Sequence, residues 1–312
     1  APPMSNGVRA AFAFAALFVA TAAFGVWRFI PAGPDPLAPR TPFDIGGALL
    51  LGGGLAALLL WISEGQTWGW GSATALVVLV VALNTLLFWI VHSIRTLHPL
   101  VNLRVVRRPE VLLANATAIG LGTAMYIGLS IASLVAQAPA DTGFGLAVPL
   151  MWAGFMMAPL SVGSLVANRT VRALSRRYDM AVFLPVGAAV MTVASVLLWL
   201  RHGDFWTLAI GMFLFGAGIG SGYAAMPALI ARSVAVDQLG SAVSFNQVLR
   251  TVGGAVGAAL SAAVLAAHPS DSAYSTDEGI TMAFGVGVIC CATVMLALVL
   301  HAIAGRRRRA QQ

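Results

Sequence analysis

Residues 211–260 read GMFLFGAGIGSGYAAMPALIARSVAVDQLGSAVSFNQVLRTVGGAVGAAL and predict two membrane-spanning helices joined by a short polar turn at Asp237-Gln238. In both helices glycine recurs at a spacing of four, which lets helix backbones approach closely in lipid. The candidates for helix packing or gating are Gly216, Gly218, Gly220, Gly222, Pro227, Gly253 and Gly257. Arg250 lies inside the second apolar run, where an arginine is costly unless it faces protein or water. This stretch therefore predicts a helix bundle around a polar pathway.

The composition of the whole chain agrees with a membrane location. Hydrophobic residues make up 59% of the 312 residues and charged residues only 9%, whereas a soluble domain carries about a quarter charged residues. Apolar runs repeatedly reach the roughly 20 residues that cross a bilayer. We therefore predict an all-α polytopic membrane protein, because long apolar runs with internal glycines favour helices over the alternating strands of a membrane barrel.

Nine such runs follow one another and predict about nine transmembrane helices. Their approximate limits are 10–27, 44–62, 72–94, 110–137, 144–167, 180–200, 205–231, 240–267 and 280–303.

The basic residues predict the orientation of these spans. All 18 are arginine, and fifteen lie on one set of alternating sides, whereas Arg9 and Arg201 lie on the other and Arg250 lies within a span. Since basic residues accumulate in cytoplasmic loops, we expect a cytoplasmic C-terminus and an N-terminus of this chain outside. The net charge of +7 is thus a topology signal, and we expect no nucleic-acid partner. The arginine-rich segments are 28–43, 95–110, 168–179, 232–239 and the C-terminal tail.

No arrangement of residues typical of an enzyme or a metal site is found. The five histidines lack HExxH spacing, no GxSxG motif occurs, and the adjacent Cys290 and Cys291 lack metal-ligand spacing. The eleven acids lie in loops or at span ends, so the carboxylate of a proton relay is not expected near the midplane of this chain. Glu64 is the nearest alternative, although a solvated turn residue is the simpler interpretation. We predict no enzyme, no metal and no cofactor.

Polar residues inside the spans are the remaining candidates for a site. Arg250 could bind an anionic or polar group, or act as a counter-charge that moves between conformations. The amides more often make hydrogen bonds between helices, and Met125 could line an adaptable cavity or simply fill space. The other polar candidates are Asn84, Asn115, Tyr126, Gln137, Tyr223, Asn246 and Gln247.

The order of several segments resembles the fourteen-helix drug/proton antiporters of the major facilitator superfamily. The segments are FDIGGALLLGGG (43–54), SEGQTWGW (63–70), HPLVNLRVVRRP (98–109), the glycine ladder ending in Pro227, and GSAVSFNQVLRTVGGAVGAAL (240–260). The resemblance implies that residues 1–30 hold the last helix of an N-terminal half. Residues 31–94 would be a cytoplasmic loop and two central linker helices, and residues 95–312 a C-terminal six-helix half with its tail. The missing N-terminal helices of the same protein are then an expected partner, without which the chain is not expected to transport.

The resemblance also implies roles for particular residues. Helices four and seven of the nine would line the central cavity, which adds Met125, Tyr126 and Tyr223 to the substrate-cavity candidates. The full set is Asn115, Met125, Tyr126, Tyr223, Asn246, Gln247 and Arg250. A cytoplasmic loop motif of the family would fall in 163–179 (GSLVANRTVRALSRRYD), where Arg176 takes the acidic position. The loop keeps its arginines, Arg169, Arg172, Arg176 and Arg177, without the acid of the motif.

The function implied is part of a bacterial inner-membrane exporter. It would move hydrophobic or cationic small molecules out of the cell by alternating access, with the proton gradient as energy source. The alternatives are a non-transporting membrane partner or sensor, and an inactive transporter fragment.

Overall fold

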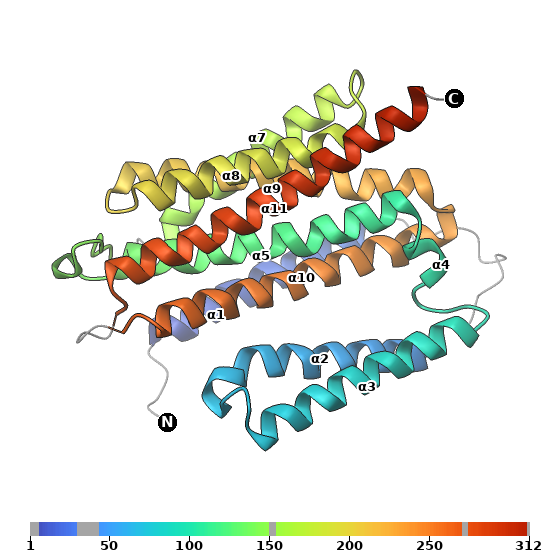
Figure 1. Ribbon diagram of the computed structural model, residues 1–312, viewed down its shortest axis with the longest axis horizontal. Helices are drawn as coiled ribbons and strands as arrows, with labels where there is room; N and C mark the ends of the chain where they lie inside the picture. Colours follow the sequence, from blue (N-terminus) through green and yellow to red (C-terminus); the bar gives the residue numbers. More distant parts are fainter. Residues whose placement is uncertain (1–5, 30–43, 150–153, 270–273, 311–312) are drawn as a thin grey trace. The chain divides into compact units, whose positions relative to one another are not determined.

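A computed structural model describes residues 6–29, 44–149, 154–269 and 274–310 of the chain, and these residues are mostly helical (Figure 1). The long helices are α1 (Asn6–Phe29), α2 (Ile45–Trp68), α3 (Ala73–Arg95), α5 (Pro109–Gln137), α7 (Ala158–Leu174), α8 (Phe183–Leu200), α9 (Phe205–Ser233), α10 (Val236–Ala266) and α11 (Asp277–Ala310). Short helical segments are α4 (Leu103–Val106), η1 (Ala140–Thr142), η2 (Gly154–Met157) and η3 (Met180–Val182).

Seven helices in the described part of the chain are long and apolar enough to cross a membrane. They correspond to seven of the nine predicted runs and confirm an all-helical polytopic protein. The two runs outside this set are 10–27, where the apolar helical segment is Ala13–Phe29, and 144–167. The turn between α9 and α10 also differs slightly, because α10 begins at Val236 and so includes Asp237-Gln238 in its first turn.

The prediction of a helix over 144–167 is wrong at both ends. Residues 144–149 are not helical; instead the backbone N–H groups of Leu146, Ala147 and Val148 donate to carbonyls at the end of α5 and just beyond it. These carbonyls have no partner within a helix, so the chain that follows satisfies them. Helix α7 starts later, with Pro159 in its first turn, and extends to Leu174.

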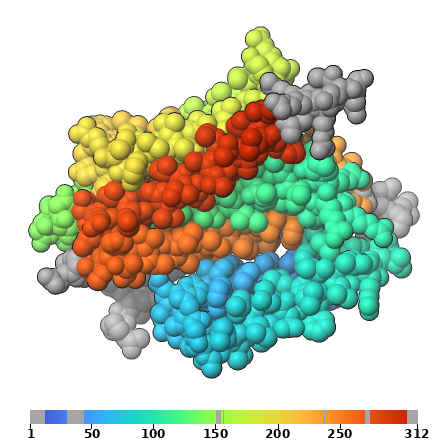
Figure 2. Space-filling model, viewed as in Figure 1, coloured from blue at the N-terminus to red at the C-terminus, as the bar shows by residue number. Residues whose placement is uncertain are grey.

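Contacts divide the chain into two units, Ala1–Pro42 and Phe43–Gln312. The first contains α1, whose large apolar side chains are exposed, as at Trp27. The second contains the other helices, and α8, α11, α5 and α10 lie side by side on the face that Figure 2 shows. Its core is made of apolar side chains from α5, α8, α9 and α11, and Leu121, Met191, Met212 and Phe284 are among those fully buried.

Helices α2 and α3 form a hairpin of their own. A Cβ at Gly54 would lie 2.8 Å from the side chain of Leu86, so the two helices approach closely there. The turn between them contains Gly69, whose φ of 79° favours glycine. The ring of Trp89 on α3 stacks on Phe245 of α10 at 5.9 Å, which joins the hairpin to the bundle.

Candidate functional site

Helices α5 and α10 touch through their backbones near their middles. A Cβ at Gly253 would collide with the carbonyl oxygen of Ile119, and one at Gly257 with the carbonyl oxygen of Thr123. The hydroxyl of Thr123 donates to the carbonyl of Gly253 at 3.0 Å. Conversely, a Cβ added to Gly122 of α5 would collide with the carbonyl oxygen of Arg250 on α10. The two glycines of α10 thus bring Arg250 directly beside α5.

Arg250 is the centre of a contact among three helices. Its guanidinium carbon lies 3.8 Å from the centre of the Tyr223 ring on α9. The hydroxyl of Tyr223 in turn donates to the sulfur of Met125 on α5 at 3.3 Å. Each of these three residues lies within four residues of the middle of its helix, about 6 Å along the axis. The contact is therefore close to the midplane of the expected membrane.

The aromatic contact alone does not offset the cost of this charge. An arginine at the centre of a span costs about 2.5–3.5 kcal/mol on insertion scales, whereas a cation–π contact contributes about 0.5–2 kcal/mol. The ion pairs found among the described residues are His92–Asp44, His202–Asp277 and Arg232–Asp179, and none of them includes Arg250. Arg250 is partly exposed, so a group from outside the described residues can approach its guanidinium.

Of the three amide side chains among the substrate-cavity candidates, Asn115 and Asn246 form a buried pair and Gln247 is exposed. The side-chain nitrogen of Asn246 donates to the side-chain oxygen of Asn115 and to the carbonyl of Ala114, both at 3.0 Å. Both asparagines are buried, and the side-chain nitrogen of Asn115 has no hydrogen-bond partner among the described residues. Gln247 is exposed. The asparagines therefore link α5 to α10, one helical turn before Arg250 on α10.

Tyr126 lies beside the contact of Arg250 but is not part of it. Its ring is packed where a Cβ at Gly254 would lie, at 2.6 Å, and the side chain is 38% exposed. Of the seven substrate-cavity candidates, the structure brings Met125, Tyr223 and Arg250 together and pairs Asn115 with Asn246. The remaining two candidates, Tyr126 and Gln247, are exposed.

The glycines of α9 lie against three different helices. A Cβ at Gly216 would collide with Leu160 of α7 and one at Gly220 with Ser164 of the same helix. A Cβ at Gly218 would lie 2.7 Å from the carbonyl of Gly187 on α8, and one at Gly222 2.8 Å from Leu121 on α5.

Pro227 lies in the interior of α9, one turn after Tyr223. Because proline has no N–H to donate, the carbonyl of Tyr223 loses its helical hydrogen bond. The helix is therefore weakened next to the residue that contacts Arg250.

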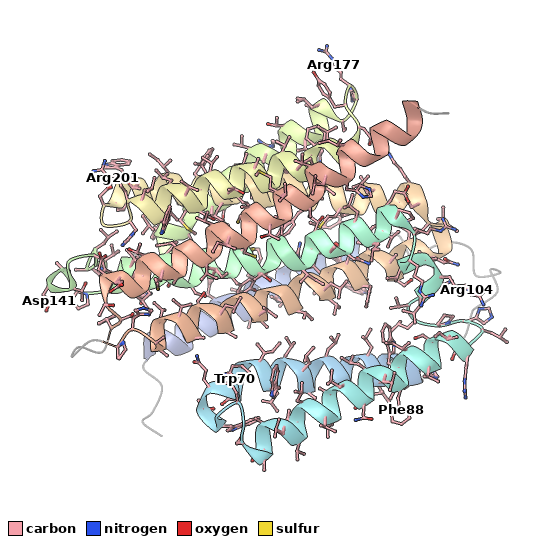
Figure 3. The ribbon with its side chains drawn as sticks, viewed as in Figure 1. Trp70, Phe88, Arg104, Asp141, Arg177 and Arg201 are labelled. Carbon is pink, nitrogen blue, oxygen red and sulfur yellow. The ribbon has the colours of Figure 1, made fainter. Side chains whose placement is uncertain are left out.

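The arginines expected in a cytoplasmic loop are divided between a helix and a turn. Arg169 and Arg172 lie within α7, and Arg176 and Arg177 follow it. The sequence-based boundary was wrong because α7 begins late and continues past the apolar run. In Figure 3, Arg104 and Arg177 lie toward one end of the helices, and Arg201 toward the other.

Two polar contacts at the end that holds Arg104 and Arg177 join residues whose pairing was not predicted from the sequence. Arg232, at the end of α9, pairs with Asp179, just before η3, at 2.9 Å. Arg108 donates to the backbone carbonyl of Ser233. Since both members of the ion pair are more than half exposed, the pair is expected to contribute at most about 1 kcal/mol. Separations of 53 and 125 residues leave no local sequence signal for these contacts.

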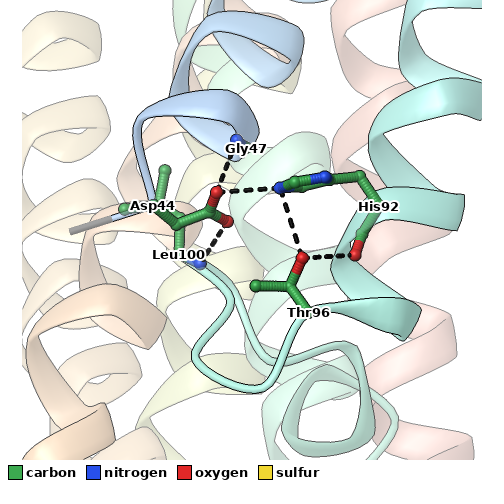
Figure 4. Close-up of polar contacts among 5 residues, drawn as sticks. All are labelled: Asp44, Gly47, His92, Thr96 and Leu100. Atoms are coloured by element: carbon green, nitrogen blue, oxygen red, sulfur yellow. Dashed lines mark hydrogen bonds and ion pairs between the residues drawn. The ribbon is translucent and has the colours of Figure 1, made fainter. Parts of the chain in front are cut away.

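A third polar contact joins the ends of α2 and α3 (Figure 4). Asp44 caps α2 by accepting a hydrogen bond from the N–H of Gly47 at 2.7 Å, and the same oxygen lies 2.8 Å from Nε2 of His92 on α3. The other carboxylate oxygen accepts from the N–H of Leu100 at 3.0 Å. The Asp44 side chain is only 5% exposed. The predicted apolar run 44–62 begins at Asp44, but the partners of this residue were not predicted.

These features describe a polytopic helical membrane protein with a charged contact at its centre, and comparison with known proteins gives its family. A family model described as sugar (and other) transporter matches residues 146–302, half of the chain. The chain therefore belongs to this family of the major facilitator superfamily, which confirms the resemblance at that level. It is a family of transporters, in agreement with the expectation that the chain is no enzyme.

Individual relatives are distant and longer. The fatty acid resistance protein FarB of Neisseria gonorrhoeae is 26% identical over 226 residues, 70% of this chain and 42% of that protein. A multidrug resistance protein B homolog of Mycobacterium tuberculosis is 26% identical over 244 residues, 74% of this chain and 43% of that protein. The chain thus spans less than half the length of these relatives. The crystal structure of the nucleoside transporter NupG aligns with a TM-score of 0.49 and 12% identity, over 80% of this chain and 65% of that one.

Proposed function

We propose that the chain is part of a bacterial inner-membrane exporter that moves hydrophobic small molecules out of the cell by alternating access. Membership of a transporter family supports transport, and the names of the two relatives, which refer to resistance, support export. The observation that carries the proposal is the contact of Arg250 with Tyr223 and Met125. Transporters commonly bind substrate near the midplane, between groups of helices that rock against one another.

In this proposal Arg250 and the other six substrate-cavity candidates contribute to one wall of the substrate cavity. Residues 95–312 act as the C-terminal six-helix half, residues 31–94 as a loop with two central helices, and residues 1–30 as the last helix of the other half. The glycines of α9 and α10 let helices slide past one another without side chains between them, and Pro227 marks a weak point of α9. The opposite wall comes from helices of the same protein beyond this chain.

The proton gradient is the proposed energy source. The acids described in the chain lie in loops or at helix ends, as Asp44, Asp179, Asp204 and Asp277 do. The carboxylate that binds the transported proton is therefore proposed to lie on the helices outside this chain. Cationic substrates, which the sequence led us to expect, would need the same acid, because Arg250 repels a cation.

The test is drug efflux from cells that express the complete gene product. The Arg250→Ala variant is expected to reach the membrane in normal amounts but to lose most efflux, while Arg201→Ala, a change at a helix end far from the site, keeps it. Full efflux by Arg250→Ala would remove Arg250 from the mechanism. Absence of efflux from the unaltered protein would instead favour the non-transporting partner or sensor.

A further inference from the structure

We propose that Arg250 binds the carboxylate of an amphiphilic anion, a molecule with one carboxylate on an apolar body. This inference rests on the proposed function, since it names the substrate class of the same site. It follows from the way the guanidinium is held, from the charges around it and from the apolar groups beside it.

The contact with Tyr223 leaves the hydrogen-bond donors of Arg250 available. A distance of 3.8 Å between the guanidinium carbon and the ring centre fits contact through the flat face of the cation. The N–H donors of a guanidinium lie at its edge, in a fork that matches the two oxygens of a carboxylate. Tyr223 itself is held in place, because its hydroxyl donates to Met125 at 3.3 Å. The ring thus positions the cation without using the groups that recognise a carboxylate.

The ion pairs among the described residues do not include Arg250, and three of the described acids have partners elsewhere. Asp44 accepts hydrogen bonds at the start of α2, Asp179 pairs with Arg232, and Asp277 lies 3.0 Å from Nε2 of His202. All three lie at helix ends, whereas Arg250 lies near the middle of α10. In a medium of low dielectric constant this positive charge attracts an anion and repels a cation over several ångströms.

The surroundings of Arg250 suit an apolar body attached to the carboxylate. Met125 is unbranched and polarisable, so it adapts to ligands of different shape. Tyr126, one residue further along α5, presents a partly exposed ring next to Gly254. The chemistry offered is therefore one cation beside aromatic and thioether groups, which fits a fatty acid or an aromatic carboxylic acid.

The experiment measures equilibrium binding to the complete gene product, purified and placed in lipid nanodiscs. Radiolabelled dodecanoate is the probe, with methyl dodecanoate and dodecylammonium as uncharged and cationic competitors of the same chain length. Saturable binding of dodecanoate is expected, with competition by methyl dodecanoate weaker by about tenfold or more. Dodecylammonium should compete least. Binding of benzoate derivatives in place of dodecanoate distinguishes an aromatic from an aliphatic preference.

Variants then assign the binding to Arg250. Arg250→Gln is expected to weaken dodecanoate binding by about ten- to a hundredfold, since it removes a charged hydrogen-bond donor, and Arg250→Lys by less, because it keeps the charge but loses the fork. Arg201→Gln is the matched control and should bind like the unaltered protein. The absence of saturable binding of both dodecanoate and the benzoate derivatives would overturn the proposal, as would equal binding by Arg250→Gln or equal competition by dodecylammonium.

Failure of this inference and failure of the proposed function remain distinguishable. Binding in nanodiscs does not require transport, so efflux is measured separately in cells with dodecanoate, methyl dodecanoate and dodecylammonium. Efflux of methyl dodecanoate and dodecylammonium without dodecanoate binding would keep the exporter and overturn the carboxylate site. Loss of efflux of methyl dodecanoate and dodecylammonium in Arg250→Gln, with no dodecanoate binding to the unaltered protein, would overturn the carboxylate site and make Arg250 a counter-charge for an acid elsewhere.

Discussion

Asp44 joins two helix ends, because it caps the start of α2 and also contacts His92 near the end of α3. The carboxylate accepts hydrogen bonds from the N–H groups of Gly47 and Leu100 and lies 2.8 Å from Nε2 of His92, while Thr96 lies 3.3 Å from the same ring nitrogen. Burial alone would raise the pKa of Asp44. The hydrogen bonds from His92, Gly47 and Leu100 outweigh burial and lower the pKa below its usual value of 3.8. The ionised form is therefore the one that the folded hairpin prefers.

Replacing this carboxylate is expected to destabilise the protein at neutral pH. Asp44→Asn should lower the free energy of unfolding by about 1–3 kcal/mol, because an amide accepts these hydrogen bonds less strongly than a charged carboxylate. Thermal unfolding in detergent at pH 7 measures the change. Asp204→Asn is the control, since Asp204 also caps a helix and has a lowered pKa through its bonds to Thr207, but it is fully exposed. If both variants lost the same free energy of unfolding, the contacts of Asp44 with His92 and Leu100 would not contribute to stability.

The same carboxylate predicts a dependence on pH. Because the folded pKa of Asp44 lies below its unfolded value, the stabilisation is complete above the unfolded value and is lost as pH falls through the folded one. The difference in unfolding temperature between the unaltered protein and Asp44→Asn should therefore be constant near neutrality and shrink below about pH 3.8. A difference that grows on acidification would contradict the direction of this pKa shift.

At the scale of helices, glycine is needed only where backbones touch. Gly253 and Gly240 both lie in α10, but a Cβ at Gly253 would collide with Ile119, whereas one at Gly240 would meet open space. Gly253→Ala is expected to destabilise the protein by about 1–3 kcal/mol through overpacking. Gly240→Ala should be neutral or stabilising by up to about 1 kcal/mol, because alanine favours helix. Equal effects in thermal unfolding would show that α5 and α10 are not in backbone contact.

The elements also show what could be predicted from the sequence and what could not. Apolar runs and arginine-rich segments locate most helices, because length and composition decide which segments cross a membrane. The start of α7 was missed because residues 146–148 bond to the carbonyls at the end of α5, a tertiary contact that overrides an apolar run. Arg250 was recognised from its charge alone. Its contact with Tyr223 was not, since it depends on how α9 and α10 are rotated.

At the scale of the whole molecule, the charges divide the unit Phe43–Gln312 into two ends. Arg104 and Arg177 lie toward one end and Arg201 and Asp141 toward the other (Figure 3). Because each long helix reverses the direction of the chain, the loops rich in arginine fall at the same end. The positive-inside rule then predicts that this end faces the cytoplasm, together with the C-terminus.

Cysteine labelling in cells that express the complete gene product tests this orientation. Arg177→Cys and Arg201→Cys are made separately in a background in which Cys290 and Cys291 of α11, and every cysteine that the gene product holds outside this chain, are replaced by alanine. A maleimide that cannot cross the membrane should label the Arg201→Cys variant in intact cells, and the Arg177→Cys variant only after permeabilisation. The background without an introduced cysteine should stay unlabelled in both cases. Fifteen of the 18 arginines are predicted to lie on the same side of the membrane as Arg177. Labelling of Arg177→Cys in intact cells, with protection of Arg201→Cys, would therefore contradict the positive-inside rule for the entire chain. It would also place the C-terminus outside.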